Sequence, residues 1–149
     1  IKSSFNQRFI VDYLIDEIEI NLFDALAIPG GFEIYGFYDD AYNDKFLDLI
    51  RAFKSNNKII ASICVGALPV GKSGVLKDKK GTVYNSPVRM EALKEFGVNV
   101  IHQPIVIDDN IITSWNPSTA TDVAFMLLEN LTTKNNADKI RQLMGFDDR

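Results

Sequence analysis

Two short apolar runs separated by a helical pattern constrain the fold of this chain more than any other feature. The runs are residues 24–28 (DALAI) and 59–63 (IIASI), and each has the length and composition of a buried strand. Asn43 or Asp44 can cap a helix between them. Apolar residues recur there at helical spacing, namely Phe46, Leu47, Leu49, Ile50 and Phe53. A strand, a helix and a second buried strand in this order predict a parallel sheet.

The same alternation continues to the end of the chain. Residues 9–20 mix β-branched and aromatic residues with acids, which favours an edge strand or a hairpin. Ser86-Pro87 can start a helix that Gly97 ends. The other predicted elements are a small-residue helix after residue 64, short strands at 82–84, 98–101, 105–107 and 111–113, a helix that Ser118 or Thr119 caps and that runs to Leu131, and a terminal helix ending near 144. The predicted fold class is α/β, a mostly parallel sheet with helices on both faces.

Size and charge favour one globular domain over residues 1–149. The chain is 46% hydrophobic and 24% charged, enough for one sizeable core. Its net charge of −4, with both signs scattered, argues against a nucleic-acid or anionic-membrane surface. It has one cysteine and no apolar run near the length of about 20 residues that spans a bilayer, so we expect a cytoplasmic protein. Residues 1–8 contain no buried strand, and we expect an N-terminal βα unit to precede Ile1.

Cys64 lies where the second apolar run ends and a helix is predicted to begin. A side chain on such a sharp turn points out of the sheet edge, and the free N–H groups of the new helix favour its anionic form. Positions of this kind can lower a cysteine pKa from about 8.5 to roughly 3.5–7.5, and the thiolate is the nucleophile. Cys64 is therefore the candidate catalytic residue.

A Gly-Gly loop at the end of the first apolar run supplies the second part of the site. Glycine backbone can turn an amide toward a reacting oxygen, so we predict that the N–H groups of Gly31 and Val65 hold an oxyanion while Cys64 attacks an electrophilic carbon. The alternative is that Cys64 is a buried small hydrophobe.

The remaining candidate residues give weaker support for a function. One histidine and one cysteine are too few for a metal site, so no metal is predicted, and chemistry carried by the cysteine alone needs no cofactor. His102 is predicted to have a surface or packing role. The aromatic residues after the Gly-Gly loop can wall either a substrate pocket or an oligomer contact, and they are Phe32, Tyr35, Phe37, Tyr38 and Tyr42.

Three segments, in this order and spacing, resemble the ThiJ/PfpI superfamily: 28–31 (IPGG), 61–67 (ASICVGA) and 106–114 (VIDDNIITS), the last followed by Pro117, Thr119 and Ala120. The superfamily includes protein deglycases, PfpI-type intracellular proteases and isonitrile hydratases. The resemblance covers roughly residues 24–131. It implies a flavodoxin-like, class I glutamine-amidotransferase-like three-layer sandwich with Cys64 at a nucleophile elbow, and a homodimer or higher homo-oligomer.

The resemblance also implies residues that this sequence replaces or does not contain. The family's acid that bonds the cysteine lies in its first βα unit, and Glu33 is a local substitute. The family places a histidine directly after the cysteine or about twenty residues on, where this sequence has Val65 and Tyr84. Peptide cleavage needs that base, so proteolysis is not expected. By family position, Tyr84 is a candidate site residue that donates a hydrogen bond to substrate.

Three functions stay open from the sequence. The first is a cysteine-dependent enzyme acting on a small-molecule electrophile: a reactive carbonyl, a glycated adduct or an amide-like group. The second is a redox-responsive, stress-protective protein in which Cys64 is oxidised reversibly. The third is a family member without activity.

Overall fold

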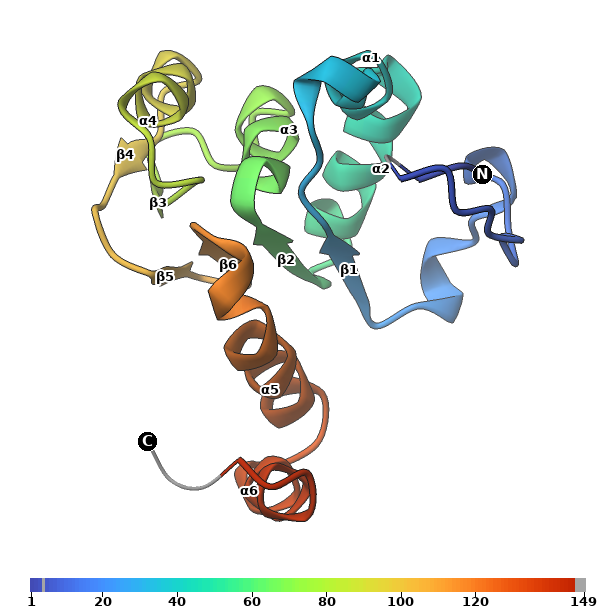
Figure 1. The fold of residues 1–149 in the computed structure, drawn as a ribbon, viewed down its shortest axis with the longest axis vertical. Coiled ribbons are helices and arrows are strands. Elements are labelled where there is room, and N and C mark those ends of the chain that lie inside the picture. Colours follow the sequence, from blue (N-terminus) through green and yellow to red (C-terminus); the bar gives the residue numbers. More distant parts are fainter. Residues whose placement is uncertain (4, 147–149) are drawn as a thin grey trace.

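The computed structural model describes residues 1–3 and 5–146 (Figure 1). Its main sheet has the strand order β1-β2-β6-β5. The strands β1 (Ala25–Ile28), β2 (Ile59–Ile63) and β6 (Ile111–Ser114) are parallel, and β5 (Ile105–Asp108) runs antiparallel to β6. A parallel pair of shorter strands consists of β3 (Lys80–Gly81) and β4 (Asn99–Val100).

Helices cover both faces of the main sheet. On one face lie α2 (Asp44–Ser55) and α3 (Ala67–Lys72), and on the other lies α5 (Ala120–Leu131) (Figure 1). Three further helices attach to these: α1 (Phe37–Ala41) beside α2, α4 (Pro87–Glu95) beside α3, and α6 (Lys134–Leu143) beside α5. The predicted α/β, flavodoxin-like class is confirmed.

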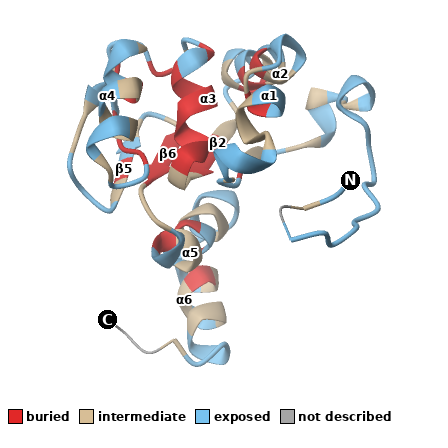
Figure 2. Ribbon diagram, turned by 45° about the horizontal axis from the view of Figure 1, so that its top comes forward, coloured by how far each residue is buried: buried red, intermediate tan, exposed pale blue. Residues whose placement is uncertain are grey.

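The main core lies between the sheet and the α2–α3 face. Ile50, Ile60 and Leu68, from α2, β2 and α3, are all at most 1% exposed. Buried residues gather in α3 and the adjoining strands (Figure 2). A smaller cluster on the α5 side contains Ala61, Ile112 and Val123. The helical pattern in residues 43–53 is thus explained by burial of one face of α2.

Several boundaries follow the sequence signals. The Asn43 side chain accepts a hydrogen bond from the Lys45 N–H at 3.0 Å, so Asn43 caps α2. Ser86 caps α4 by accepting from the Arg89 N–H at 3.5 Å, with Pro87 as the first helical residue. Gly97 follows α4 with a φ of 78°, a left-handed conformation that glycine adopts without strain.

The strand or hairpin predicted for residues Phe9 to Ile20 is wrong. This part of the chain contains the 3₁₀ turns η1 (Ile15–Glu17) and η2 (Ile20–Leu22), and residues 9–14 are irregular. Its alternating apolar residues have no ladder partner in the described part of the chain, where an isolated bridge joins Lys2 to Arg8. Side chains such as Ile10 are therefore exposed.

The strand predicted at Thr82 to Tyr84 is displaced to β3, two residues earlier. The Thr82 N–H donates to the Thr113 hydroxyl oxygen at 2.9 Å, and the Tyr84 N–H donates to the Cys64 carbonyl at 3.2 Å. Because these two N–H groups donate to a side chain and to the Cys64 turn, they are not available to a strand ladder, and β3 ends at Gly81. Position 84 is still tied directly to the backbone of Cys64.

Candidate functional site

Cys64 occupies a strained turn between β2 and α3. Its φ is 62°, a left-handed conformation that costs a non-glycine residue about 1–2 kcal/mol. A 3₁₀ turn, η4 (Cys64–Gly66), then leads into α3. Strained residues persist only where their surroundings fix them, and they cluster at functional sites. The sharp strand-to-helix turn predicted at this residue is present.

Two glycines allow the β1 loop to approach this turn closely. A Cβ placed on Gly30 would lie 2.8 Å from the Cβ of Cys64. A Cβ on Gly66 would lie 2.7 Å from the carbonyl oxygen of Pro29. Both distances are shorter than real Cβ contacts, so the approach requires glycine at each position. The close contact between the two strand ends holds Cys64 beside the Gly-Gly loop.

A cavity of about 640 Å³ opens at this contact, a volume typical of small-molecule sites. It brings together the four residues predicted from the sequence: Cys64, Gly31, Val65 and Tyr84. Further lining residues that sequence reasoning did not assign to the site are Arg89, Asn116, Pro117 and Ala120. Tyr38 also lines the cavity, so the aromatic segment after the Gly-Gly loop contributes one of its walls.

Burial raises the pKa of the Cys64 thiol above its ordinary value. A hydrogen bond from the backbone N–H of Val65 and the positive charge of Arg89 both lower this pKa, but their effect is smaller than the cost of desolvating the anion. The depressed pKa expected from the sequence is therefore wrong for the described chain. The loss of water around the half-buried sulfur outweighs the stabilisation of the thiolate by the turn.

Arg89 and Glu33 form an ion pair at the cavity wall. An Arg89 guanidinium nitrogen lies 2.7 Å from a Glu33 carboxylate oxygen, and the Arg89 Cζ lies 5.2 Å from the centre of the Tyr38 ring. Glu33 also lines the cavity, and its carboxylate accepts a hydrogen bond from Arg89. Burial raises the pKa of the Tyr38 phenol, which stays protonated at neutral pH.

His102 lies outside the cavity lining and is exposed. Its Nε2 is 3.0 Å from the Asn85 side-chain oxygen, and its ring packs edge-on against Trp115 at 5.3 Å. This placement agrees with the surface or packing role predicted for it.

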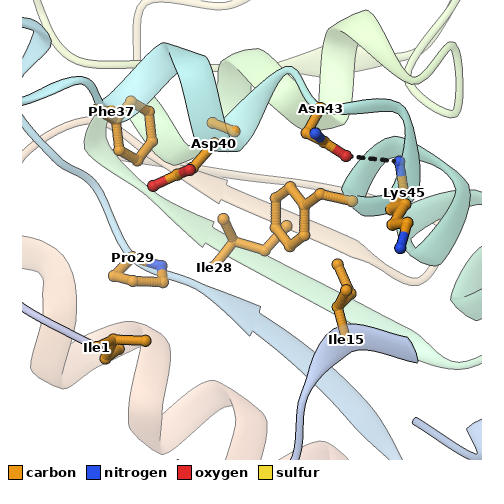
Figure 3. Close-up of a pocket in the computed structure, with 10 residues that line it drawn as sticks. Ile1, Ile15, Ile28, Pro29, Phe37, Asp40, Asn43 and Lys45 are labelled. Atoms are coloured by element: carbon orange, nitrogen blue, oxygen red, sulfur yellow. Dashed lines mark hydrogen bonds between the residues drawn. The ribbon is translucent and has the colours of Figure 1, made fainter. Parts of the chain in front are cut away.

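A second cavity of about 610 Å³ lies between the N-terminal segment, β1 and α2. Ile1, Ile15, Ile28 and Phe37 form its largely apolar wall, and Pro29 is shared with the Cys64 cavity (Figure 3). Its lining holds no cysteine, serine, threonine or histidine among the described residues.

In residues 1–3 and 5–146, no group of three or more histidine, cysteine, aspartate or glutamate side chains could hold a metal ion. None of the helices in this range is long and apolar enough to cross a membrane.

A model of the DJ-1/PfpI family matches residues 1–130. The chain belongs to the DJ-1/PfpI family. Its membership confirms the resemblance read from the three motifs.

Three relatives in the family are 30% to 34% identical to this chain over the aligned residues. An uncharacterized protein of Methanocaldococcus jannaschii is 30% identical over 86% of this chain and 62% of its own length. Deglycase PfpI of Pyrococcus furiosus is 34% identical over 72% of this chain and 61% of its own. DJ-1 homolog A of Arabidopsis thaliana is 30% identical over 92% of this chain and 34% of its own. The chain thus spans less than two thirds of these relatives.

Solved structures of the family share the fold. Drosophila melanogaster DJ-1beta superposes with a TM-score of 0.86 at 25% identity, covering 99% of this chain and 77% of that one. Oxidized Toxoplasma gondii DJ-1 gives 0.83 at 25% identity, covering 99% and 78%. The family includes proteins named deglycase and one named a general stress protein, from Bacillus subtilis, 32% identical over 72% of this chain and 60% of its own.

Proposed function

We propose that the protein is a cysteine-dependent enzyme that acts on a small electrophile, a reactive carbonyl or a glycated or amide-like group. The observation that carries the proposal is Cys64 at positive φ on the wall of a cavity sized for a small molecule. Deglycase-named relatives support the carbonyl class.

In the proposed first step, the Cys64 sulfur adds to the carbonyl carbon. The new S–C bond forms as the C=O π electrons move to oxygen, and the thiol proton ends on that oxygen, giving a hemithioacetal. The N–H groups of Gly31 and Val65 are the proposed donors to the developing oxyanion, each worth about 3–4 kcal/mol when preorganised. Tyr84 lines the same cavity and is the proposed donor to bound substrate.

The test is the consumption of a small 2-oxoaldehyde by the wild type, Cys64→Ala and Cys64→Ser. We expect turnover by the wild type and none by either variant, because neither variant carries the thiol. Full activity in Cys64→Ala would contradict the mechanism. Thermal unfolding of each variant serves as the control for folding.

A redox role for Cys64 is the second candidate. The structure contains one half-buried free thiol, and a neighbour of similar fold is described as oxidized DJ-1. Intact mass after mild peroxide distinguishes this role from catalysis. A discrete gain of oxygen at Cys64, without turnover of carbonyl or amide substrates, would favour the redox protein, and an inert Cys64 would indicate an inactive family member.

A cytoplasmic location and a homodimer or higher homo-oligomer complete the proposed assignment. Exposed apolar side chains in residues 1–22, including Phe5, Ile10 and Leu14, support self-association because burying apolar surface between two copies is favourable. Light scattering coupled to size-exclusion chromatography measures the mass directly. A monomer at micromolar concentration would contradict the assembly.

A further inference from the structure

The cavity at Cys64 has a single basic side chain among the described residues that line it, Arg89. This side chain comes from the first turn of α4 and is 27% exposed. It acts at Cys64 through charge, since its cation favours the thiolate form. Any anionic group that enters the cavity therefore meets one positive partner, and that partner is close enough to influence the nucleophile.

Tyr38 and Glu33 position Arg89 in different ways. The Tyr38 ring lies under the guanidinium at 5.2 Å, an arrangement that holds a cation by its face. Glu33 accepts the one side-chain hydrogen bond of Arg89 that the described chain shows, and its own side chain is 63% exposed. An ion pair with such an exposed carboxylate contributes little to stability. The Glu33 carboxylate can thus be displaced while the Tyr38 ring keeps the guanidinium in place.

We propose that Arg89 selects small electrophiles that carry a carboxylate, by binding that group in place of the Glu33 carboxylate while the electrophilic carbon meets Cys64. Guanidinium groups can bind carboxylates through two parallel N–H donors, and Arg89 already binds the Glu33 carboxylate through one of its N–H groups. The substrate class is short acids with an adjacent carbonyl, such as 2-oxo acids and aldehyde acids. The inference rests on the proposed nucleophilic role of Cys64 and adds a specificity-determining residue to it.

The selection of anions by Arg89 can be tested with iodoacetate and iodoacetamide. The two reagents have nearly the same shape, but only iodoacetate carries a negative charge. Each alkylates a thiol, forming an S–C bond as iodide leaves and the thiol proton passes to water. The ratio of the two rates, measured by intact mass, reports anion selection, because any change in the thiol pKa affects both reagents alike. The rate with iodoacetamide alone reports whether Cys64 is reactive.

We expect Arg89→Gln to lower the iodoacetate-to-iodoacetamide ratio about tenfold, the effect of losing a hydrogen bond to a charged group. Glu33→Gln removes the competing carboxylate and should raise the ratio. Arg141→Gln is the matched control. Arg141 is 28% exposed, its Cζ lies 4.2 Å from the Phe125 ring and it pairs with Asp122 at 3.8 Å, but it is not among the residues that line the cavity.

An iodoacetate-to-iodoacetamide ratio that is unchanged in folded Arg89→Gln, or lowered in Glu33→Gln, would overturn the inference. The Arg89–Glu33 ion pair would then only connect α4 to the loop after Gly31. The Glu33 variant keeps the test open if Arg89→Gln fails to fold, because Glu33 is exposed. Absence of labelling by both reagents would contradict the role of Cys64 itself, and the inference would fall with it.

Discussion

Two opposing influences act on the Cys64 thiol. Partial burial raises its pKa, whereas the Val65 N–H and the Arg89 charge lower it, and burial prevails. A protein with this balance keeps the thiol protonated near neutral pH. Its reactivity then depends on groups that accept or relocate the proton during attack, more than on a standing thiolate.

At the residue scale, this balance predicts the pH dependence of labelling. We expect the rate of Cys64 alkylation by iodoacetamide to rise with pH, with a midpoint above the ordinary cysteine pKa of about 8.5. In Arg89→Gln the midpoint should move further up, because a cation that favours the thiolate is lost. A wild-type midpoint well below about 8.5 would show a stabilised thiolate and contradict the prediction.

At the element scale, the start of α2 depends on one side chain. Asn43 accepts from the Lys45 N–H, as the dashed line in Figure 3 marks, and so satisfies a donor at the helix end. We expect Asn43→Ala to lower the free energy of unfolding by about 0.5–2 kcal/mol. Asn43→Asp keeps a capping oxygen and should lose little. Equal stability of the two variants in urea unfolding would contradict the capping role.

Sequence patterns predicted the elements of this fold where local signals and burial agree. β2 and α4 have a clear apolar pattern or clear caps, and both are found where expected. The N-terminal strand prediction failed because a strand needs a partner, and partners are not visible in local alternation. The same distinction applies to the residues of the site. Cys64 is visible at a strand end, whereas Arg89 reaches the cavity only because α4 packs beside α3.

At the scale of the whole molecule, half-buried phenols couple stability to alkaline pH. Burial raises the pKa of Tyr42 from 10.0 to about 12, and the folded state therefore holds the phenol proton more tightly than the unfolded chain does. This contribution to stability is complete below pH 10 and is lost as the pH rises through about 12. The ring centre of Tyr38 lies 5.1 Å from that of Tyr42, and burial also raises the pKa of the Tyr38 phenol. Ionisation of Tyr38 at high pH therefore lowers stability in the same way.

We expect Tyr42→Phe to lose less stability than the wild type between pH 10 and about 12, because the phenol that ionises is gone. Urea midpoints across that range measure the effect. Tyr35→Phe, at a side chain that is 55% exposed, controls for the loss of a hydroxyl. Parallel pH profiles for the wild type and Tyr42→Phe would contradict the prediction.

Because the backbone at Cys64 is left-handed, any side chain at this position lowers the stability of the fold. Glycine relieves this conformation at little cost, so Cys64→Gly should be more stable than Cys64→Ala by about 1 kcal/mol, the reverse of the order found within ordinary helices. Thermal melts of the two variants measure the difference. A selection for heat resistance alone would then favour glycine at this position, and the proposed reactivity of Cys64 is what the cysteine side chain would supply in exchange.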